Sequence, residues 1–215
     1  FDPVKDFSHV ALFGGPPLVF AVSLGVPAKT MTEFIAMAKA KPDAFSYGSP
    51  GIGTNGDLFG ELLKQINGIS MTHIPYKGAA GAVVDLAAEH LPAISSTLTT
   101  AGAQIRASKV RALAISSNAR LADYPDVPTC RELGFAELVA VTWFSLSGPA
   151  GVPAEIVTRL NGEVRRALQA PESREKLRPE GIEPGTLNPK EFTDFVAAEY
   201  KRWAPVVRAS GAKAE

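Results

Sequence analysis

The sequence predicts an α/β fold in which strands and helices alternate along the chain. Short apolar runs are repeatedly followed by segments with helical spacing, which is typical of βαβ units and a largely parallel sheet. The 215 residues are 46% hydrophobic and 20% charged, enough apolar material for one sizeable core or two smaller ones. A glycine-rich turn between a strand-like run and a helix is the third observation, because α/β proteins often bind ligands at such turns.

The first half of the chain gives the clearest alternation. A strand is expected at Leu18–Ser23, and a capping box opens a helix over Thr30–Ala40. The strand-like run Phe45–Ser49 leads through the glycine turn into an amphipathic helix over 54–66. A strand, a helix, a strand, a short helix and a strand are then expected at 71–74, 79–88, 91–95, 100–107 and 110–116.

The second half begins with a polar connection and a second capping box, Thr129–Glu132. A strand is expected at 139–147, and Pro153 stands at the first position of a long helix. Asn188 caps a final helix with an aromatic stripe that is expected to be core. Pro205 is expected to kink or restart this helix near its end.

The glycine turn, Gly51–Gly56, matches the G-x-G-x-x-G pattern of dinucleotide sites. That pattern requires an acidic residue about 20 positions further on, at the end of the next strand. The next strand-like run ends in Tyr76 and Lys77 instead, so a dinucleotide is disfavoured and no cofactor is expected. Glycines and the unpaired N–H groups of a first helical turn still suit an anion.

Polar side chains follow three of the expected strands. They are Ser49 and Thr54 around the glycine turn, Tyr76 and Lys77 after the next strand, and Ser95–Thr97 after the third. The carboxyl ends of parallel strands meet at one edge of a sheet, so these groups are expected to converge. With few cations nearby, the set favours reversible carboxylate capture over catalysis.

Catalytic and metal-binding patterns are not found. The three histidines lack metal-ligand spacing, and His73 in a strand is expected to be packed or on the surface instead of acting as a base. Cys130 is expected in a first helical turn, which would lower its pKa, but no thiol-enzyme motif surrounds it. Asp57 and Glu61, four residues apart, are interpreted as a solvated helix face. We therefore expect neither an enzyme nor a metal site.

Charge and hydropathy exclude two further classes of partner. The formal net charge of zero, with acids and bases interspersed, gives no basic surface for nucleic acid. The apolar run Val10–Val26 is interrupted by glycines and prolines, so it is not expected to span a membrane. The chain starts at Phe1 without an initiator methionine or a signal peptide and is interpreted as mature, trimmed or a fragment. A single cysteine leaves the redox compartment open.

Seven short motifs resemble those of extracytoplasmic solute receptors of the tripartite tricarboxylate transporter family, also called Bug proteins. In order they are DPVKDF at 2–7, VPAKT at 26–30, YGS at 47–49 with the Gly-x-Gly-Thr turn, IPYKG at 74–78, RALA at 111–114, PDVPT at 125–129 and PAG at 149–151. The resemblance covers essentially the whole chain.

The resemblance implies a type II periplasmic binding protein with two α/β lobes, here lacking the N-terminal part of lobe 1. Residues 12–126 would form lobe 2, and 1–11 with 127–215 the remainder of lobe 1. It implies a periplasmic protein that captures a small carboxylate and delivers it to the membrane components of a tripartite transporter. No cofactor, nucleic acid, membrane insertion or enzymatic chemistry is implied.

Together the residues and the resemblance predict a ligand-binding set: Ser49, Gly51, Gly53, Thr54, Asn55, Tyr76, Lys77, Ser96 and Thr97. Two departures leave the ligand open: Asp57 stands where the family usually has histidine, and Ser96 where it usually has an acid. Trp143 and Phe144 are expected to form either an apolar wall of the site or part of the core.

Three alternatives to a solute receptor remain. The ligand-sensing domain of a transcription regulator can share the two-lobe fold, but it requires a DNA-binding segment. A dinucleotide-binding enzyme would require cofactor binding. A structural fragment without binding competence is the third.

Overall fold

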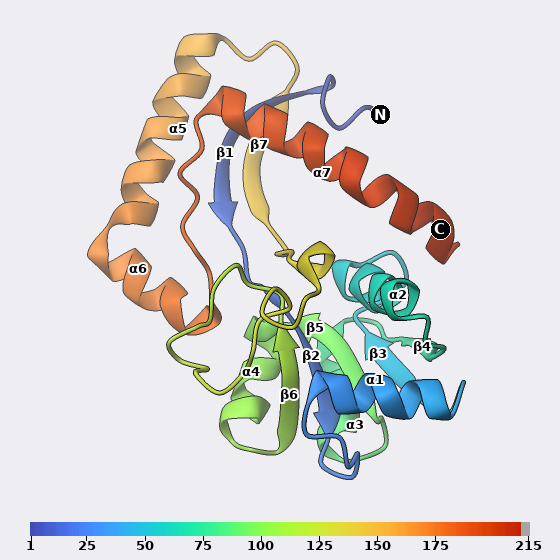
Figure 1. The fold of residues 1–215 in the computed structure, drawn as a ribbon. Coiled ribbons are helices and arrows are strands. Elements are labelled where there is room, and N and C mark those ends of the chain that lie inside the picture. The colour runs from blue at the N-terminus through green and yellow to red at the C-terminus, as the bar shows by residue number, and fades with distance from the viewer. Residues whose placement is uncertain (212–215) are drawn as a thin grey trace. The chain divides into compact units, whose positions relative to one another are not determined.

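The structure, a computed structural model, describes residues 1–211 and divides into two compact units. Unit 1 comprises Phe1–Pro16 and Thr142–Ala209, and unit 2 comprises Pro17–Val141 together with the chain from Ser210. The colours of Figure 1 follow the residue number, so the two segments of unit 1 can be distinguished from the chain between them. Each unit has its own sheet.

Unit 2 is built on five strands: β2 (Leu18–Ser23), β3 (Ser46–Ser49), β4 (Thr72–Pro75), β5 (Ala93–Thr97) and β6 (Val110–Ile115). Their order in the sheet is β4-β3-β5-β2-β6 (Figure 1). β3 is parallel to β4 and β5, whereas β2 is antiparallel to β5 and β6. The sheet is therefore mixed, with four strands in one direction and β2 opposed. The sequence could not show this, because a strand buried at every residue has no pattern that reveals its direction.

Two helices cover each face of this sheet: α1 (Met31–Ala40) and α2 (Asn55–Asn67) on one face, α3 (Ala79–Ala87) and α4 (Leu98–Arg106) on the other. Alternate residues of β2 serve the two cores, since Phe20 packs with Phe34 and Phe59, and Val19 packs with Leu86. The predicted cap of α1 forms, and α2 begins after an N-cap at Thr54, where its start was expected.

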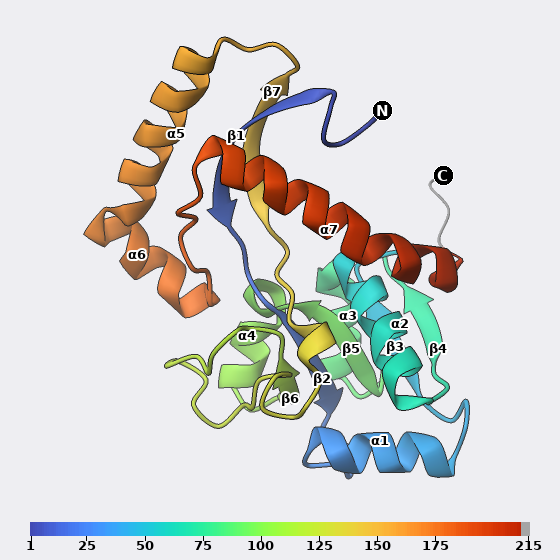
Figure 2. The same ribbon diagram turned by 45° about the horizontal axis from the view of Figure 1, so that its top comes forward.

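Unit 1 contains an antiparallel pair, β1 (Phe7–Gly14) and β7 (Phe144–Pro149), and the helices α5 (Ala154–Gln169), α6 (Pro171–Leu177) and α7 (Pro189–Ser210) (Figure 2). Val157 of α5 packs against Val10 and Ala11 of β1. The buried Asn161 amide donates hydrogen bonds to Val10 O at 2.8 Å and Leu187 O at 3.0 Å, which fixes α5 to β1 and to the segment before α7.

Several predicted elements in the second half differ from the structure. The strand expected at 139–147 begins later, as β7. The Thr129–Glu132 capping box forms, with Glu132 N donating to Thr129 Oγ1 at 3.1 Å, but it closes a turn instead of opening a helix. Pro205 lies inside α7 and does not restart it (Figure 2), because one missing N–H does not end a helix whose Phe192 and Val196 are buried. A kink at Pro205 stays a prediction.

The compact units do not start and end where the lobes were expected. Leu12 lies in β1 and pairs with Ser145 of β7, so it belongs to unit 1. The chain beyond residue 126 returns to β6, where Cys130 N donates to Ile115 O at 2.8 Å, and it stays in unit 2 as far as Val141. The assignment of these units to lobes of a longer receptor stays a prediction.

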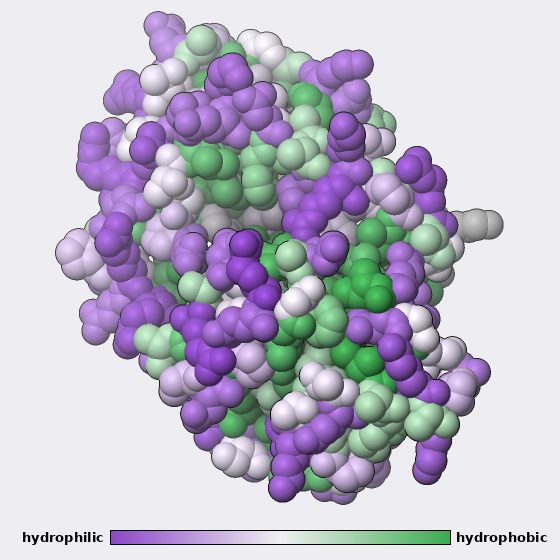
Figure 3. All heavy atoms as spheres, in the orientation of Figure 1, coloured by the Kyte–Doolittle hydropathy of each residue, from purple (hydrophilic) through white to green (hydrophobic). Residues whose placement is uncertain are grey.

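The apolar stripe of α5 is only partly covered. Ile156 and Leu160 belong to this stripe and are 45% and 41% exposed, because a two-stranded sheet is too narrow to cover the whole stripe. On the face shown in Figure 3, hydrophilic residues dominate and hydrophobic ones form small groups between them. Among the residues described, no helix has the length and apolar character needed to cross a membrane.

Gly60→Ala is expected to lower the free energy of unfolding by about 1–3 kcal/mol. A Cβ at Gly60 of α2 would lie 2.2 Å from Cε2 of Tyr47, whose ring is fully buried and cannot move aside. Urea denaturation followed by circular dichroism measures the change. Gly162→Ala in α5 is the matched control, because nothing lies within 4 Å of its added Cβ and helix propensity favours alanine. Equal stability of the two variants would contradict the close packing of α2 on Tyr47.

Candidate functional site

Three parallel strands of unit 2 end side by side at one edge of the sheet. β3 lies between β4 and β5, and Tyr76 N, just after β4, donates to Ser49 O at 3.1 Å. A Cβ on Gly56, in the first turn of α2, would lie 2.5 Å from Ser95 O of β5. The three polar groups named from the sequence therefore meet at one edge, as expected. Whether they bind a ligand stays a prediction.

The glycine turn joins β3 to α2 and depends on two glycines with positive φ. The φ angle is +146° at Gly51 and +72° at Gly53. Thr54 is the N-cap of α2 and Asn55 is the first helical residue. The Thr54 hydroxyl donates to Gly51 O at 2.7 Å and accepts from Asp57 N at 3.4 Å. This hydroxyl therefore holds the turn against the helix.

The anion held by this turn is a side chain of the protein itself. Asp57, in the first turn of α2, is 3% exposed, and its Oδ2 accepts a hydrogen bond from Gly53 N at 2.8 Å. Its Oδ1 lies 3.2 Å from both Tyr47 Oη and His73 Nδ1. The first turn of a helix favours such a carboxylate. The turn is thus an anion site whose observed occupant is internal.

A second backbone donor of the turn is also engaged within the chain. Gly51 N donates to Ser49 Oγ at 3.1 Å, and Ser49 is fully buried. Two backbone N–H groups that were expected to face a ligand, those of Gly51 and Gly53, therefore bind Ser49 and Asp57.

Asp57 and Glu61 do not form a solvated helix face, so that interpretation is wrong. The fully buried Tyr47 donates its hydroxyl to Glu61 Oε1 at 2.8 Å, and Lys64 Nζ donates to the same oxygen at 2.8 Å. Burial, together with the hydrogen bond to Glu61, raises the pKa of Tyr47, which therefore stays a donor. The sequence missed this because two acids four residues apart look the same whether they face water or a buried tyrosine.

His73 of β4 connects Asp57 to Ser49. Its Nε2 lies 2.7 Å from Ser49 Oγ, and its ring stacks on Tyr47 with centroids 4.9 Å apart. Burial lowers the pKa of His73 and outweighs the nearby carboxylates of Asp57 and Glu61, which raise it. The imidazole is therefore neutral at pH 7, with the proton on Nδ1 facing Asp57 and Nε2 accepting from Ser49.

Ser49, His73 and Asp57 have the connectivity of a serine nucleophile relay. A nucleophile must reach its substrate, however, and Ser49 is 0% exposed, with its Oγ bonded to Gly51 N. The arrangement therefore supports a network that holds the turn in place.

The other predicted ligand residues at this edge differ in their contacts. The Tyr76 hydroxyl donates to Asp85 Oδ2 at 2.7 Å, and this bond raises the pKa of Tyr76 to about 12. Thr97 Oγ1 lies 3.0 Å from Thr100 Oγ1. Lys77 is exposed. Lys77 therefore offers the edge a positive charge.

The hydroxyls of Ser95 and Ser96 are buried and have no hydrogen-bond partner among the residues described. As successive residues of β5 they lie on opposite faces of the sheet, and Ser95 O adjoins the first turn of α2. Buried polar groups are nearly always bonded, so each of these hydroxyls, one on either face of the sheet, is a candidate to bond a polar group of a ligand. Ser95 was not in the predicted ligand-binding set. The run of three hydroxyl residues, Ser95–Thr97, could have indicated it from the sequence.

Two other candidates, Cys130 and Trp143, have structural roles. Cys130 is buried, and burial raises its pKa to about 12, so the expected lowering is wrong because the preceding capping box opens no helix. Trp143 packs against Phe192 and Phe195 in the core of unit 1, whereas Phe144 is 56% exposed. Within residues 1–211, no group of three or more His, Cys, Asp or Glu side chains could hold a metal ion.

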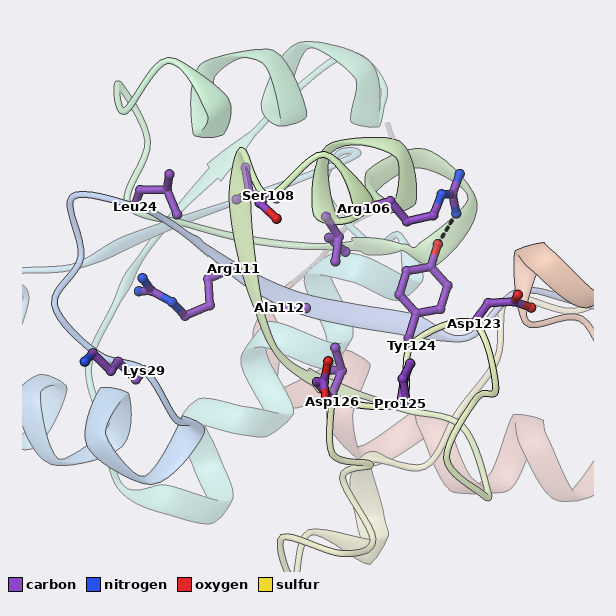
Figure 4. A pocket seen from close by; sticks show the side chains of 13 residues that line it. Leu24, Lys29, Arg106, Ser108, Arg111, Ala112, Asp123, Tyr124, Pro125 and Asp126 are labelled. Atoms are coloured by element: carbon purple, nitrogen blue, oxygen red, sulfur yellow. Dashed lines mark hydrogen bonds between the residues drawn. The ribbon is translucent and has the colours of Figure 1, made fainter.

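A cavity of about 550 Å³ lies beside β6 and shares no lining residue with the predicted set (Figure 4). The two arginines that line it donate hydrogen bonds to other parts of the chain. Arg111 Nη1 donates to Val26 O at 3.2 Å and Ala28 O at 3.0 Å, and Arg106 Nη1 donates to the Tyr124 hydroxyl. These bonds hold the loops around β6, so the cavity is not part of the candidate site.

Comparison with known proteins places the chain in a family. A family model described as "Tripartite tricarboxylate transporter family receptor" matches residues 1–212. The chain belongs to this receptor family. The protein BugT of Bordetella pertussis is 34% identical to this receptor over 210 residues, which make up 98% of the chain and 64% of BugT.

Solved structures agree with this assignment. A structure described as a periplasmic transporter matches with a TM-score of 0.89 and 34% sequence identity. A structure of an R. palustris protein with adipate matches with a TM-score of 0.87 and 32% sequence identity. Each match covers 99% of this receptor and 71% of the other chain. The predicted fold class, that of periplasmic binding proteins, is confirmed. The receptor chain spans about two thirds of the length of these relatives.

The stability of the protein is expected to fall as the pH drops through about 6.5, the unfolded pKa of histidine. Because the native pKa of His73 lies below that value, the unfolded chain binds the proton first. The contribution of His73 is complete above about pH 7.5 and is lost progressively as the pH falls toward the native pKa. Urea denaturation at a series of pH values measures the effect.

His73→Gln is expected to flatten this dependence. His90→Gln is the control, because the His90 side chain is 75% exposed, and it should leave the dependence as in the wild type. If the free energy of unfolding changed with pH by the same amount in wild type and His73→Gln, the buried neutral imidazole would be contradicted.

Proposed function

We propose that this receptor is a periplasmic solute-binding protein that captures a small organic carboxylate, a di- or tricarboxylate or a related acid. It delivers the ligand to the membrane components of a tripartite transporter. The observation that carries the proposal is the edge of the unit 2 sheet, where three strand ends meet a helix N-terminus and two buried, unpartnered hydroxyls. Ligands of α/β proteins bind at such edges. The relative solved with adipate supports a carboxylate.

The predicted residues divide into two roles in this proposal. Lys77 and the hydroxyls of Ser96 and Thr97 contact the ligand, with Tyr76 and Asn55 beside them. The other four residues hold the turn: Ser49, Gly51, Gly53 and Thr54. Binding is reversible and involves no catalytic step and no cofactor. Ser49, which is bonded to His73, is buried under the turn and serves to hold it.

Lys77→Ala is expected to weaken carboxylate binding by the complete protein about fivefold, since an exposed charge contributes about 1 kcal/mol. Isothermal titration calorimetry with succinate, malate, citrate and adipate measures this. Lys109→Ala is the control, because Lys109 is also exposed but precedes β6, at the opposite edge of the sheet. Absence of binding by every acid would contradict the proposed function.

Ser96→Ala separates a binding role from a structural one. Removal of a buried hydroxyl without a partner is expected to leave the free energy of unfolding unchanged or to raise it slightly. Carboxylate affinity should instead fall about tenfold, because a hydrogen bond to a charged group is lost. Urea denaturation and calorimetry on the same preparation measure both. Unchanged affinity would remove Ser96 from the site.

A further inference from the structure

The glycine turn of unit 2 carries a net negative charge. The N-terminus of a helix is equivalent to about half a positive charge, whereas the Asp57 carboxylate contributes a full negative charge. Asp57 is 3% exposed, and its Oδ2 lies 2.8 Å from Gly53 N. His73 is neutral at pH 7, and Glu61 is paired with Lys64 at 2.8 Å. No neighbouring cation therefore compensates for Asp57 within this network.

Three donors of the turn are already engaged. Gly53 N binds Asp57, Gly51 N binds Ser49, and the Thr54 hydroxyl binds Gly51 O. An incoming carboxylate would have to displace Asp57 or accept its repulsion at short range.

Displacement of Asp57 is opposed by packing. Its Oδ1 is held by Tyr47, whose fully buried ring lies against Gly60, and by His73, whose ring stacks on Tyr47. Rotation of Asp57 away from these groups would leave the Nδ1–H of His73 and the N–H of Gly53 without their partner, and a buried donor without a partner costs free energy. The negative charge is therefore a fixed feature of the turn.

We propose that Asp57 is a specificity-determining residue, and that unit 2 selects a ligand whose end at the glycine turn is uncharged, such as an amide or a hydroxyl. The preferred ligand is then a monocarboxylate with a neutral polar group at its other end. This inference rests on the proposed function, because it requires a carboxylate ligand at this edge of the sheet.

The unpartnered hydroxyl of Ser95 at the same edge fits a neutral group. It can donate and accept a hydrogen bond, which suits an amide or a hydroxyl as well as an anion. Ser95 is paired with Phe20 of β2, which packs with Phe59 of α2, so the Ser95 hydroxyl lies on the face of the sheet that α2 covers. Recognition by this hydroxyl beside a fixed negative charge favours the uncharged end.

Calorimetry at pH 7.5 on the complete protein tests the proposal with matched pairs: succinate, glutarate and adipate, each beside its monoamide. The members of a pair have nearly the same shape and differ by one charge. The wild type is expected to bind the monoamide about tenfold more tightly than the dianion. Asp57→Asn should bring the two affinities within about threefold, because it removes the charge and keeps the shape.

Glu89→Gln is the control for net charge. Glu89 is an exposed acid of unit 2 that precedes β5, at the opposite edge of the sheet, and its removal should leave the wild-type ratio unchanged. Circular dichroism verifies that each variant is folded. If Asp57→Asn does not fold, the ratio of the wild-type affinities for monoamide and dianion tests the inference on its own.

Two results would overturn the inference and leave the proposed function standing: a wild-type preference for the dianion, or the same ratio in wild type and folded Asp57→Asn. Absence of binding by every acid and monoamide would overturn the proposed function, and the inference with it.

Discussion

The buried carboxylate of Asp57 is the interaction on which the candidate site depends. It joins the glycine turn through Gly53 N, β3 through Tyr47 and β4 through His73. Burial of a carboxylate costs several kcal/mol, and hydrogen bonds to a charged group contribute about 1.5–3 kcal/mol each, so the bonds from Gly53 N and His73 Nδ1 are both needed to offset it. The positions of two strands and a helix start are thereby fixed together.

The first half of the fold could be predicted from local signals. The bounds of β2 and the cap of α1 follow from an apolar run and from side chains that bond within four residues along the chain. The opposed direction of β2 could not be predicted, because its partners β5 and β6 are distant in the sequence. The second half was harder, since the Thr129–Glu132 box has the same local bonds in a turn as in a helix.

The position of the candidate site at the strand ends was predicted from the sequence, but the hydrogen-bond partners within the site were predicted only in part. The convergence of strand ends follows from parallel pairing of β3 with its neighbours. The internal occupant of the turn did not follow, because the burial of Asp57 depends on Tyr47 and His73, which reach it from two strands. A glycine turn at a helix start indicates an anion, and the rest of the fold decides whether that anion is a ligand or a side chain.

The fixed position of Asp57 can be tested by a crystal structure of the complete receptor with a bound organic acid. We expect Gly53 N still to donate to Asp57 Oδ2, and the carboxylate oxygens of the ligand to lie away from the backbone N–H groups of Gly51 and Gly53. A ligand carboxylate within hydrogen-bond distance of Gly53 N, with Asp57 turned away from His73 and Tyr47, would contradict it.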